Sequence, residues 1–168
     1  MIAILPPEPG DGFCVWRLDR RVHAATWNSG EGAFRAGGRW NSRGVRAVYT
    51  SLDAATAIVE VAVHKGFDEL DIEPHTVTRA QLHLQTSLTV VLPADIPNAN
   101  WLVPGTPTAG QKRFGDDLLA AHGAFLIPSV VSRHSWNMVI DASALPGMVA
   151  QVEQEPLAID PRLASGTG

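Results

Sequence analysis

The sequence has one cysteine, one tyrosine and only 18% charged residues, and these shortages narrow the possible classes of protein. The single thiol, Cys14, cannot form an internal disulfide and gives no metal-binding spacing, so a reducing compartment fits best. No apolar run is long enough for a membrane span, and residues 1–7 lack the basic start of a signal peptide. We therefore expect a cytoplasmic protein that does not bind membranes.

Basic residues are also scarce, since 13 lysines and arginines against 17 acidic residues leave a formal net charge of −4. This balance argues against direct binding to nucleic acid, whose polyanionic backbone favours a basic surface. The charge is nevertheless uneven, because Arg35, Arg39, Arg43 and Arg46 follow one another with no acid between them. Two interpretations stay open for this arginine cluster: a solvated loop, or a site for a small ligand that carries phosphate.

Several familiar site motifs are incomplete in this chain. The six histidines are scattered without a zinc-like spacing, so we expect no metal site. Residues 30–35 lack the third glycine of a dinucleotide fingerprint, and residues 105–112, GTPTAGQK, carry Gln111 where a phosphate loop needs glycine. Ser132, His134 and Asp141 come close together without the strained turn that a hydrolase nucleophile needs. We therefore reject a Rossmann fold, a P-loop and a serine hydrolase.

The length and the 45% apolar composition suit one domain with a hydrophobic core. Short alternating or apolar segments predict strands, and apolar segments that begin at capping residues and end at glycine predict helices. The expected strands are 13–18, 46–51, 76–84, 88–92, 124–129 and 136–141, and the expected helices are 54–65, 111–122 and 143–151. The remaining segments are an irregular lead-in (1–12), a flexible loop (19–35), an acidic connector (68–73), a long loop (93–110) and an irregular tail (156–168).

The stretch from Gly37 to Glu60 gathers the residue types that ligand binding needs. Gly37 and Gly38 allow positive φ angles and a close approach of a ligand to the backbone. Arg39 follows them with a planar fork of donors that suits phosphate or carboxylate. Tyr49 adds an aromatic hydroxyl in the next expected strand. We therefore look for the active site in this stretch.

Glu60 is the only charged residue in the first ten positions of the expected helix 54–65, which should be buried on most sides. A carboxylate in such surroundings is costly unless a cation, a donor or a solvated cleft receives it. Glu60 either forms a buried ion pair with Arg17 or Arg39, or faces the hydroxyl groups of a ligand. Arg17 is itself either an edge-facing strand residue or a second cation directed into the same cleft as Arg39.

These residues resemble the RES-domain toxins of bacterial toxin–antitoxin pairs, a family named for an arginine, a glutamate and a serine. The matching segments are Val15-Trp16-Arg17, Gly37-Gly38-Arg39-Trp40-Asn41 with Gly44, Val48-Tyr49-Thr50-Ser51, Ala57 to Glu60, and Ile127-Pro128-Ser129 followed by Asn137. They span most of the chain in the family's order. The resemblance implies one RES domain over residues 1–168: a compact α+β domain, similar to ADP-ribosyltransferases, with a split mixed or antiparallel central sheet flanked by helices.

The resemblance further implies an enzyme that acts on NAD as its substrate, with no additional cofactor. It gives catalytic roles to Glu60, Arg39 and Tyr49. It implies substrate binding by Arg17, Gly38, Trp40, Asn41, Ser51, Ser129 and Asn137. The acceptor of ADP-ribose stays open: transfer to water or phosphate degrades NAD, transfer to a cellular protein makes an ADP-ribosyltransferase, and a chain that kept only the fold is an inactive ligand-binding module.

An enzyme that consumes NAD without restraint would kill its own cell. The resemblance therefore implies a cognate antitoxin protein, in this family a helix-turn-helix protein of the Xre type. A homodimer of the toxin within the toxin–antitoxin complex is a further expectation.

Overall fold

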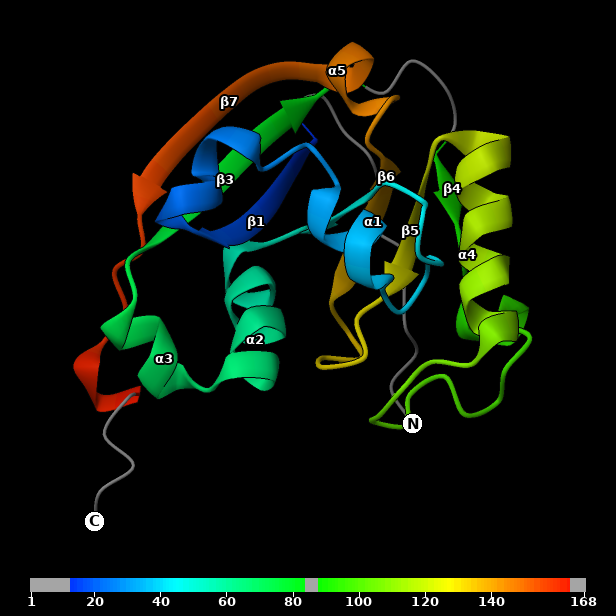
Figure 1. Ribbon diagram of the computed structural model, residues 1–168, viewed down its shortest axis with the longest axis horizontal. Coiled ribbons are helices and arrows are strands. Elements are labelled where there is room, and N and C mark those ends of the chain that lie inside the picture. Colours follow the sequence, from blue (N-terminus) through cyan, green and yellow to red (C-terminus); the bar gives the residue numbers. More distant parts are fainter. Residues whose placement is uncertain (1–12, 84–87, 164–168) are drawn as a thin grey trace.

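The computed structural model describes residues 13–83 and 88–163 (Figure 1). Its strands are β1 (Cys14–Arg20), β2 (Ala47–Ser51), β3 (His75–Leu82), β4 (Thr89–Val90), β5 (Ala124–Pro128), β6 (Trp136–Asp141) and β7 (Val149–Pro156). Its α-helices are α1 (Glu31–Ala36), α2 (Ala54–Lys65), α3 (Phe67–Ile72), α4 (Ala109–His122) and α5 (Leu145–Met148), and 3-10 helices cover Arg21–Thr26, Pro93–Asp95 and Pro161–Leu163. No helix within these two described ranges combines the length and apolar character that crossing a membrane requires.

The strands form one mixed sheet in the order β4-β5-β6-β2-β1-β3-β7, in which β4 and β5 run parallel and the other neighbours antiparallel. The sheet is divided at its centre, because the described parts of β1 and β2 pair only at Trp16 and Ser51. By contrast, β1 pairs with β3 along its whole length. This architecture confirms the expected α+β domain with a split mixed sheet and flanking helices, similar to ADP-ribosyltransferases.

Both faces of the β4-β5-β6-β2 half of the sheet are covered. Leu126 of β5 packs in a cluster with α5, whereas its neighbours Phe125 and Ile127 pack in a second cluster with α4. Strands buried on both faces lack polar alternation, which explains the continuous apolar character of β5. On the β1-β3-β7 half, α2 and α3 pack over a third cluster that includes Leu18 and Val77. Figure 1 shows α2 and α4 as two separate columns against the sheet.

Local capping signals correctly locate the two long helices. The Asp53 carboxylate accepts a hydrogen bond of 2.7 Å from the Thr56 backbone N–H, and Gly66 ends α2 with a φ of 87°. Helix α2 therefore has the expected limits of 54 and 65. Helix α4 begins at Ala109 after the cap formed by the Thr108 side chain, two residues before the expected start at Gln111, and ends at His122 before the left-handed Gly123 as expected.

Three segments differ from the expectations. The loop expected over 19–35 contains a 3-10 helix and α1, and the acidic connector 68–73 lies almost wholly in α3. The helix expected over 143–151 ends at Met148, and the following residues form β7 instead. β7 carries exposed polar side chains, so its pairing with β3 rather than an apolar pattern determines its structure.

The beginning of the expected tail is also better ordered than predicted. The Leu157 backbone N–H donates to the His75 carbonyl at 3.0 Å, and Leu157 and Ile159 pack against the cluster beneath α2 and α3. The expected lead-in 1–12, the end of the expected strand at Leu84, and residues 164–168 of the tail lie outside the described residues.

Candidate active site

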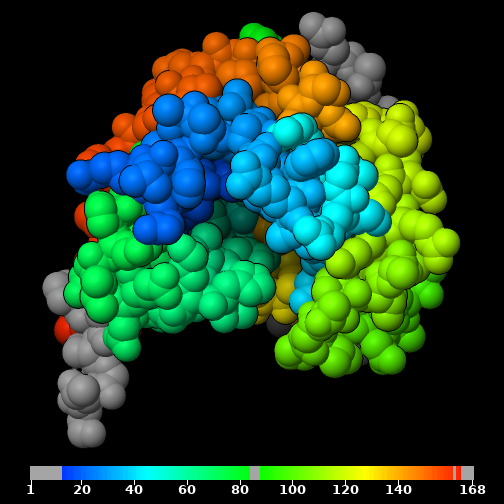
Figure 2. Space-filling view, viewed as in Figure 1, coloured from blue at the N-terminus to red at the C-terminus, as the bar shows by residue number. Residues whose placement is uncertain are grey.

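A pocket of about 690 Å³ opens on the face of the sheet that carries α2 and α4 (Figure 2). Its floor lies where the sheet divides between β1 and β2, and one of its walls is α2. The opposite wall consists of the loop 36–40, the segment 105–107 and Lys112 of α4. Small-molecule sites commonly occupy about 300–1,000 Å³, so this pocket has the size of a nucleotide site.

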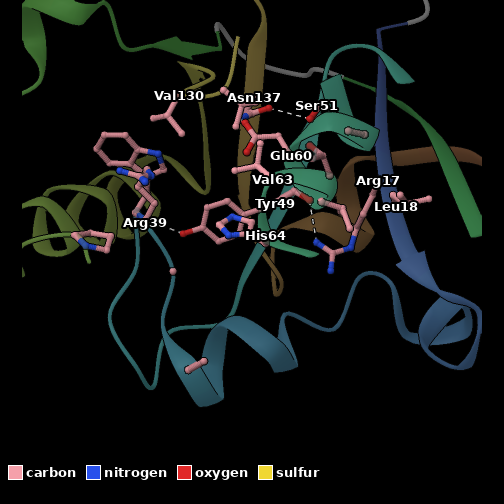
Figure 3. Close-up of a pocket in the computed structure, with 18 of the residues that line it drawn as sticks. Arg17, Leu18, Arg39, Tyr49, Ser51, Glu60, Val63, His64, Val130 and Asn137 are labelled. Atoms are coloured by element: carbon pink, nitrogen blue, oxygen red, sulfur yellow. Dashed lines mark hydrogen bonds between the residues drawn. The ribbon is translucent and has the colours of Figure 1, made fainter. Parts of the chain in front are cut away.

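Glu60 extends from α2 into this pocket, and neutral donors hold one of its oxygens (Figure 3). Its Oε1 accepts hydrogen bonds from Ser129 Oγ at 2.7 Å and from Asn137 Nδ2 at 2.5 Å. Ser51 Oγ donates to Asn137 Oδ1 at 2.8 Å, which fixes the orientation of the amide. No group in the described part of the chain donates to Oε2, so this oxygen is available to a ligand. The expected ion pair of Glu60 with Arg17 or Arg39 does not form, and that interpretation was wrong.

Strand pairing explains how these polar groups meet. Ser51 of β2 lies directly opposite Asn137 of β6, and paired residues share one face of a sheet. Ser129 follows the end of β5 and is fully buried, so it acts from behind the pocket wall. Its Oγ accepts the backbone N–H groups of Val131 and Ser132, both at 3.1 Å. With its acceptor sites occupied, the Ser129 hydroxyl directs its single proton at Glu60.

Arg17 lines the pocket but already has partners of its own. Its guanidinium forms a two-pronged contact with the Asp19 carboxylate, with 2.8 Å between Nη2 and Oδ1. Its Nη1 donates to the Tyr49 carbonyl oxygen at 2.9 Å, across the gap where the β1–β2 ladder is interrupted. Arg17 thus supplies a hydrogen bond that the divided sheet lacks. Its predicted contact with substrate stays a prediction.

The Tyr49 hydroxyl closes a tight turn at the pocket. It donates to Asn41 Oδ1 at 2.7 Å and accepts the Trp40 backbone N–H at 3.0 Å. Burial raises the pKa of the Tyr49 hydroxyl far above its usual range, so the group stays protonated. A Cβ at Gly38 would lie 2.5 Å from both that hydroxyl and Asn41 Oδ1, and only glycine fits. Gly37 uses the positive φ that glycine allows, at 73°, whereas Gly38 does not.

Two other predicted site residues support the loop that carries Arg39. Asn41 is fully buried, does not line the pocket, and donates through its amide to three carbonyl oxygens, those of Ala33, Ser42 and Val45. Trp40 is almost completely buried, and its ring packs against Trp101 and Phe114 with centroids 6.3 and 6.4 Å away. These contacts fix the loop so that the Arg39 side chain faces the pocket.

The arginine cluster of the sequence is dispersed in space. Arg35 and Arg46 both form ion pairs with Glu31 on the surface, and neither lines the pocket. The Arg43 side chain is exposed and donates to the Arg35 carbonyl oxygen at 2.7 Å. Of the four, Arg39 faces the pocket, where its Nη1 donates to the Trp101 carbonyl oxygen at 3.1 Å. The interpretation of the whole cluster as one phosphate site was therefore wrong.

Sequence reasoning missed three basic residues that line the pocket: His64, Lys65 and Lys112. His64 lies four residues after Glu60, a spacing that places two side chains on the same face of a helix and could have indicated it. The expectation that the helix 54–65 is buried on most sides was also wrong. Val63 is 60% exposed, because this side of α2 forms the rim of the pocket.

The sequence matches the RES domain family over residues 15–161. It is 26% identical over 152 residues to a protein named Toxin Res from Photorhabdus laumondii, covering 89% of this chain and 96% of that protein. Toxin Res of Yersinia enterocolitica is 27% identical over 148 residues, which cover 86% and 94% of the two chains. The Prs ADP-ribosylating toxin of a Sphingobium strain is 30% identical over 133 residues, or 75% and 80% of the two chains. Because the family match covers most of the chain, this chain belongs to the RES-domain toxin family.

Proposed function

We propose that this chain is a toxin that cleaves the bond between nicotinamide and ribose in NAD. One observation carries the proposal: Glu60 has one carboxylate oxygen held by Ser129 and Asn137 and the other open to the pocket. Cleavage of an N-glycosidic bond develops positive charge on the ribose, as in glycoside hydrolysis. A fixed carboxylate stabilises that charge because it needs no reorganisation during the reaction.

Each step of this reaction has a group in the pocket to support it. Nicotinamide leaves with the bonding electron pair, and an acceptor oxygen then bonds to the ribose carbon and loses its proton. The open oxygen of Glu60 stabilises the ribosyl cation and accepts hydrogen bonds from the ribose hydroxyls. The Tyr49 ring supports the nicotinamide ribose, and the Arg39 fork pairs with the pyrophosphate. Ser51 contributes indirectly by orienting Asn137.

Transfer of ADP-ribose to a cellular protein is the second candidate function. One observation favours it: the Sphingobium relative is named a Prs ADP-ribosylating toxin. The two functions share the cleavage step and differ only in the acceptor.

The test is to incubate the purified protein with NAD, with and without inorganic phosphate, and to identify the products. Release of nicotinamide with ADP-ribose or its phosphate ester supports NAD degradation. Labelling of an added protein fraction from isotopically labelled NAD, with little free ADP-ribose, favours transfer. An unchanged NAD level in every arm would contradict both functions and leave a binding module.

Control by an antitoxin forms part of the proposal. The pocket presents the cations of Arg39, Lys65 and Lys112 beside the single carboxylate of Glu60. An acidic segment or a chain terminus of a helix-turn-helix partner would complement these cations and exclude NAD by occupying the same pocket.

A further inference from the structure

Lys112 is a basic residue of the pocket whose charge is not explained by the rest of the described chain. It lies near the start of α4 and lines the pocket on the wall that also carries Arg39. Its Nζ would lie 3.5 Å from a Cβ built on Gly37, so the ammonium sits directly over the glycine backbone.

The Lys112 ammonium has no ion pair or side-chain hydrogen bond within the described residues. Asp116, one turn further along α4, accepts the Ser42 backbone N–H at 3.0 Å and forms no ion pair with Lys112. Lys112 is nevertheless half-buried, so part of its hydration is lost without compensation. An anionic ligand in the pocket would supply the missing counter-charge.

Arg17 on the pocket floor and Arg39 on the same wall as Lys112 differ in whether an acidic side chain already neutralises their charge. The Arg17 charge is paired with Asp19. Arg39 gives one N–H to the Trp101 carbonyl and forms no ion pair within the described chain. Arg39 and Lys112 therefore leave two positive charges and no carboxylate on one wall, whereas the opposite wall, α2, carries the carboxylate of Glu60 together with His64 and Lys65.

We propose that Lys112 is the second cation, beside Arg39, that binds the diphosphate of a nucleoside diphosphate ligand. This inference rests on the proposed function and adds the orientation in which the ligand lies in the pocket. The diphosphate lies against the wall of loop 36–40 and α4, and the ribose that reacts lies against Glu60. The stretch 105–112 is no P-loop, yet it brings residues 105–107 and Lys112 to the pocket.

The test compares Lys112→Met with Arg113→Met, which removes a charge from the same helix at an exposed residue outside the pocket lining. Binding of ADP, ADP-ribose and adenosine is measured by calorimetry. Because Lys112→Met loses a charge-assisted contact, we expect its affinity for ADP and ADP-ribose to fall by about tenfold or more. Its affinity for adenosine should not change. For NAD turnover, KM rises by a similar factor and kcat stays within about threefold, because the contact is equal in the ground and transition states.

Two further outcomes separate this inference from the proposed function. Lys112→Arg keeps the charge and should retain ADP affinity within about threefold. Equal ADP affinity of Lys112→Met and wild type overturns the inference, and NAD cleavage stands if wild type still consumes NAD. If Lys112→Met weakens the binding of adenosine and ADP equally, the inference is also overturned, because a merely structural role of Lys112 would affect both ligands. A wild-type protein that binds ADP through Lys112 but leaves NAD intact supports the diphosphate site and contradicts the proposed function.

Discussion

Glu60 combines a fixed carboxylate oxygen with a free one, so its charge can be removed without removing its hydrogen bonds. In Glu60→Gln, the amide oxygen can still accept from Ser129 and Asn137, while the group facing the pocket becomes neutral. We expect NAD turnover to fall by about 10²–10³-fold, the usual loss for a transition-state contact. The free energy of unfolding should change by less than about 1 kcal/mol.

Turnover of NAD and thermal unfolding of the purified variant check this prediction. Activity within a few-fold of wild type would remove Glu60 from the mechanism. A large fall in melting temperature would instead assign Glu60 a mainly structural role.

Tyr49 is the only tyrosine of the chain, so the phenolate absorbance of the protein reports this residue alone. Burial raises its pKa, which means that the folded state favours the protonated hydroxyl. The stabilisation is fully present below the unfolded pKa of about 10 and is lost as the pH rises towards the higher folded pKa. We expect phenolate absorbance to appear only above pH 10 in native protein, together with unfolding, and near pH 10 in denatured protein.

A spectrophotometric titration followed in parallel by circular dichroism checks this expectation. Ionisation near pH 10 with the fold intact would show that the Tyr49 hydroxyl is open to solvent. Asn41 would then lack the fixed donor that the turn requires.

Helix α4 and the loop that carries Arg39 approach each other most closely at one glycine, Gly115. A Cβ on Gly115 would lie 1.9 Å from the Trp40 carbonyl oxygen, so any side chain separates the helix from the loop. We expect Gly115→Ala to lower the free energy of unfolding by at least about 2 kcal/mol. Denaturant unfolding measures the loss, and ADP binding should weaken because Arg39 and Lys112 move apart.

Gly110→Ala is the matched control in the same helix. Its Cβ would make ordinary contact with Thr108 Oγ1 at 3.9 Å. Alanine is the better helix former, so stability should stay equal or rise by up to about 1 kcal/mol. Equal stability of Gly115→Ala and Gly110→Ala would contradict the close packing of α4 on the loop.

The elements that sequence analysis located are those whose signals are local. Asp53 and Gly66 define both ends of α2 from adjacent residues, and the expected limits were correct. β7 has no such signal, because Glu153 and Glu155 lie in an exposed edge strand whose backbone is held by its ladder with β3. For the same reason, the helix predicted over 143–151 was wrong from residue 149 onward, where β7 begins.

The same distinction holds for the candidate site. Glu60 was identified because a lone charge interrupts an apolar helix, which is a local signal. Its hydrogen-bond partners Ser129 and Asn137 lie 69 and 77 residues further along the chain. Periodicity cannot supply such pairings, and here the family resemblance identified both residues. Lys112 belonged only to the incomplete P-loop motif of residues 105–112, and its place in the pocket became visible only when α4 was placed beside the loop.

The division of the sheet determines how the whole molecule can be inhibited. The pocket lies where β1 and β2 separate, with α2 in one wall and Lys112 of α4 in the opposite wall. Figure 1 shows these two helices well apart from each other. A single acidic segment inserted there would contact both walls and exclude NAD without any change of fold. We therefore expect expression of this chain alone to deplete NAD and arrest growth, and co-expression of a helix-turn-helix protein encoded beside it to restore growth.

The anchoring residue of such an inhibitor can be tested with two arginines of the same loop region. Arg39 faces the pocket, whereas the exposed Arg43 does not line it. If the antitoxin occupies the pocket, Arg39→Ala should weaken the binding of both antitoxin and ADP by about tenfold or more. The control variant Arg43→Ala should leave both affinities within about twofold of wild type. Calorimetry of the purified pair measures these affinities, and competition with ADP tests the shared site.

Equal antitoxin affinity for Arg39→Ala and wild type would assign the anchor to another residue. A toxin–antitoxin complex that still bound ADP would show that the antitoxin acts outside the pocket.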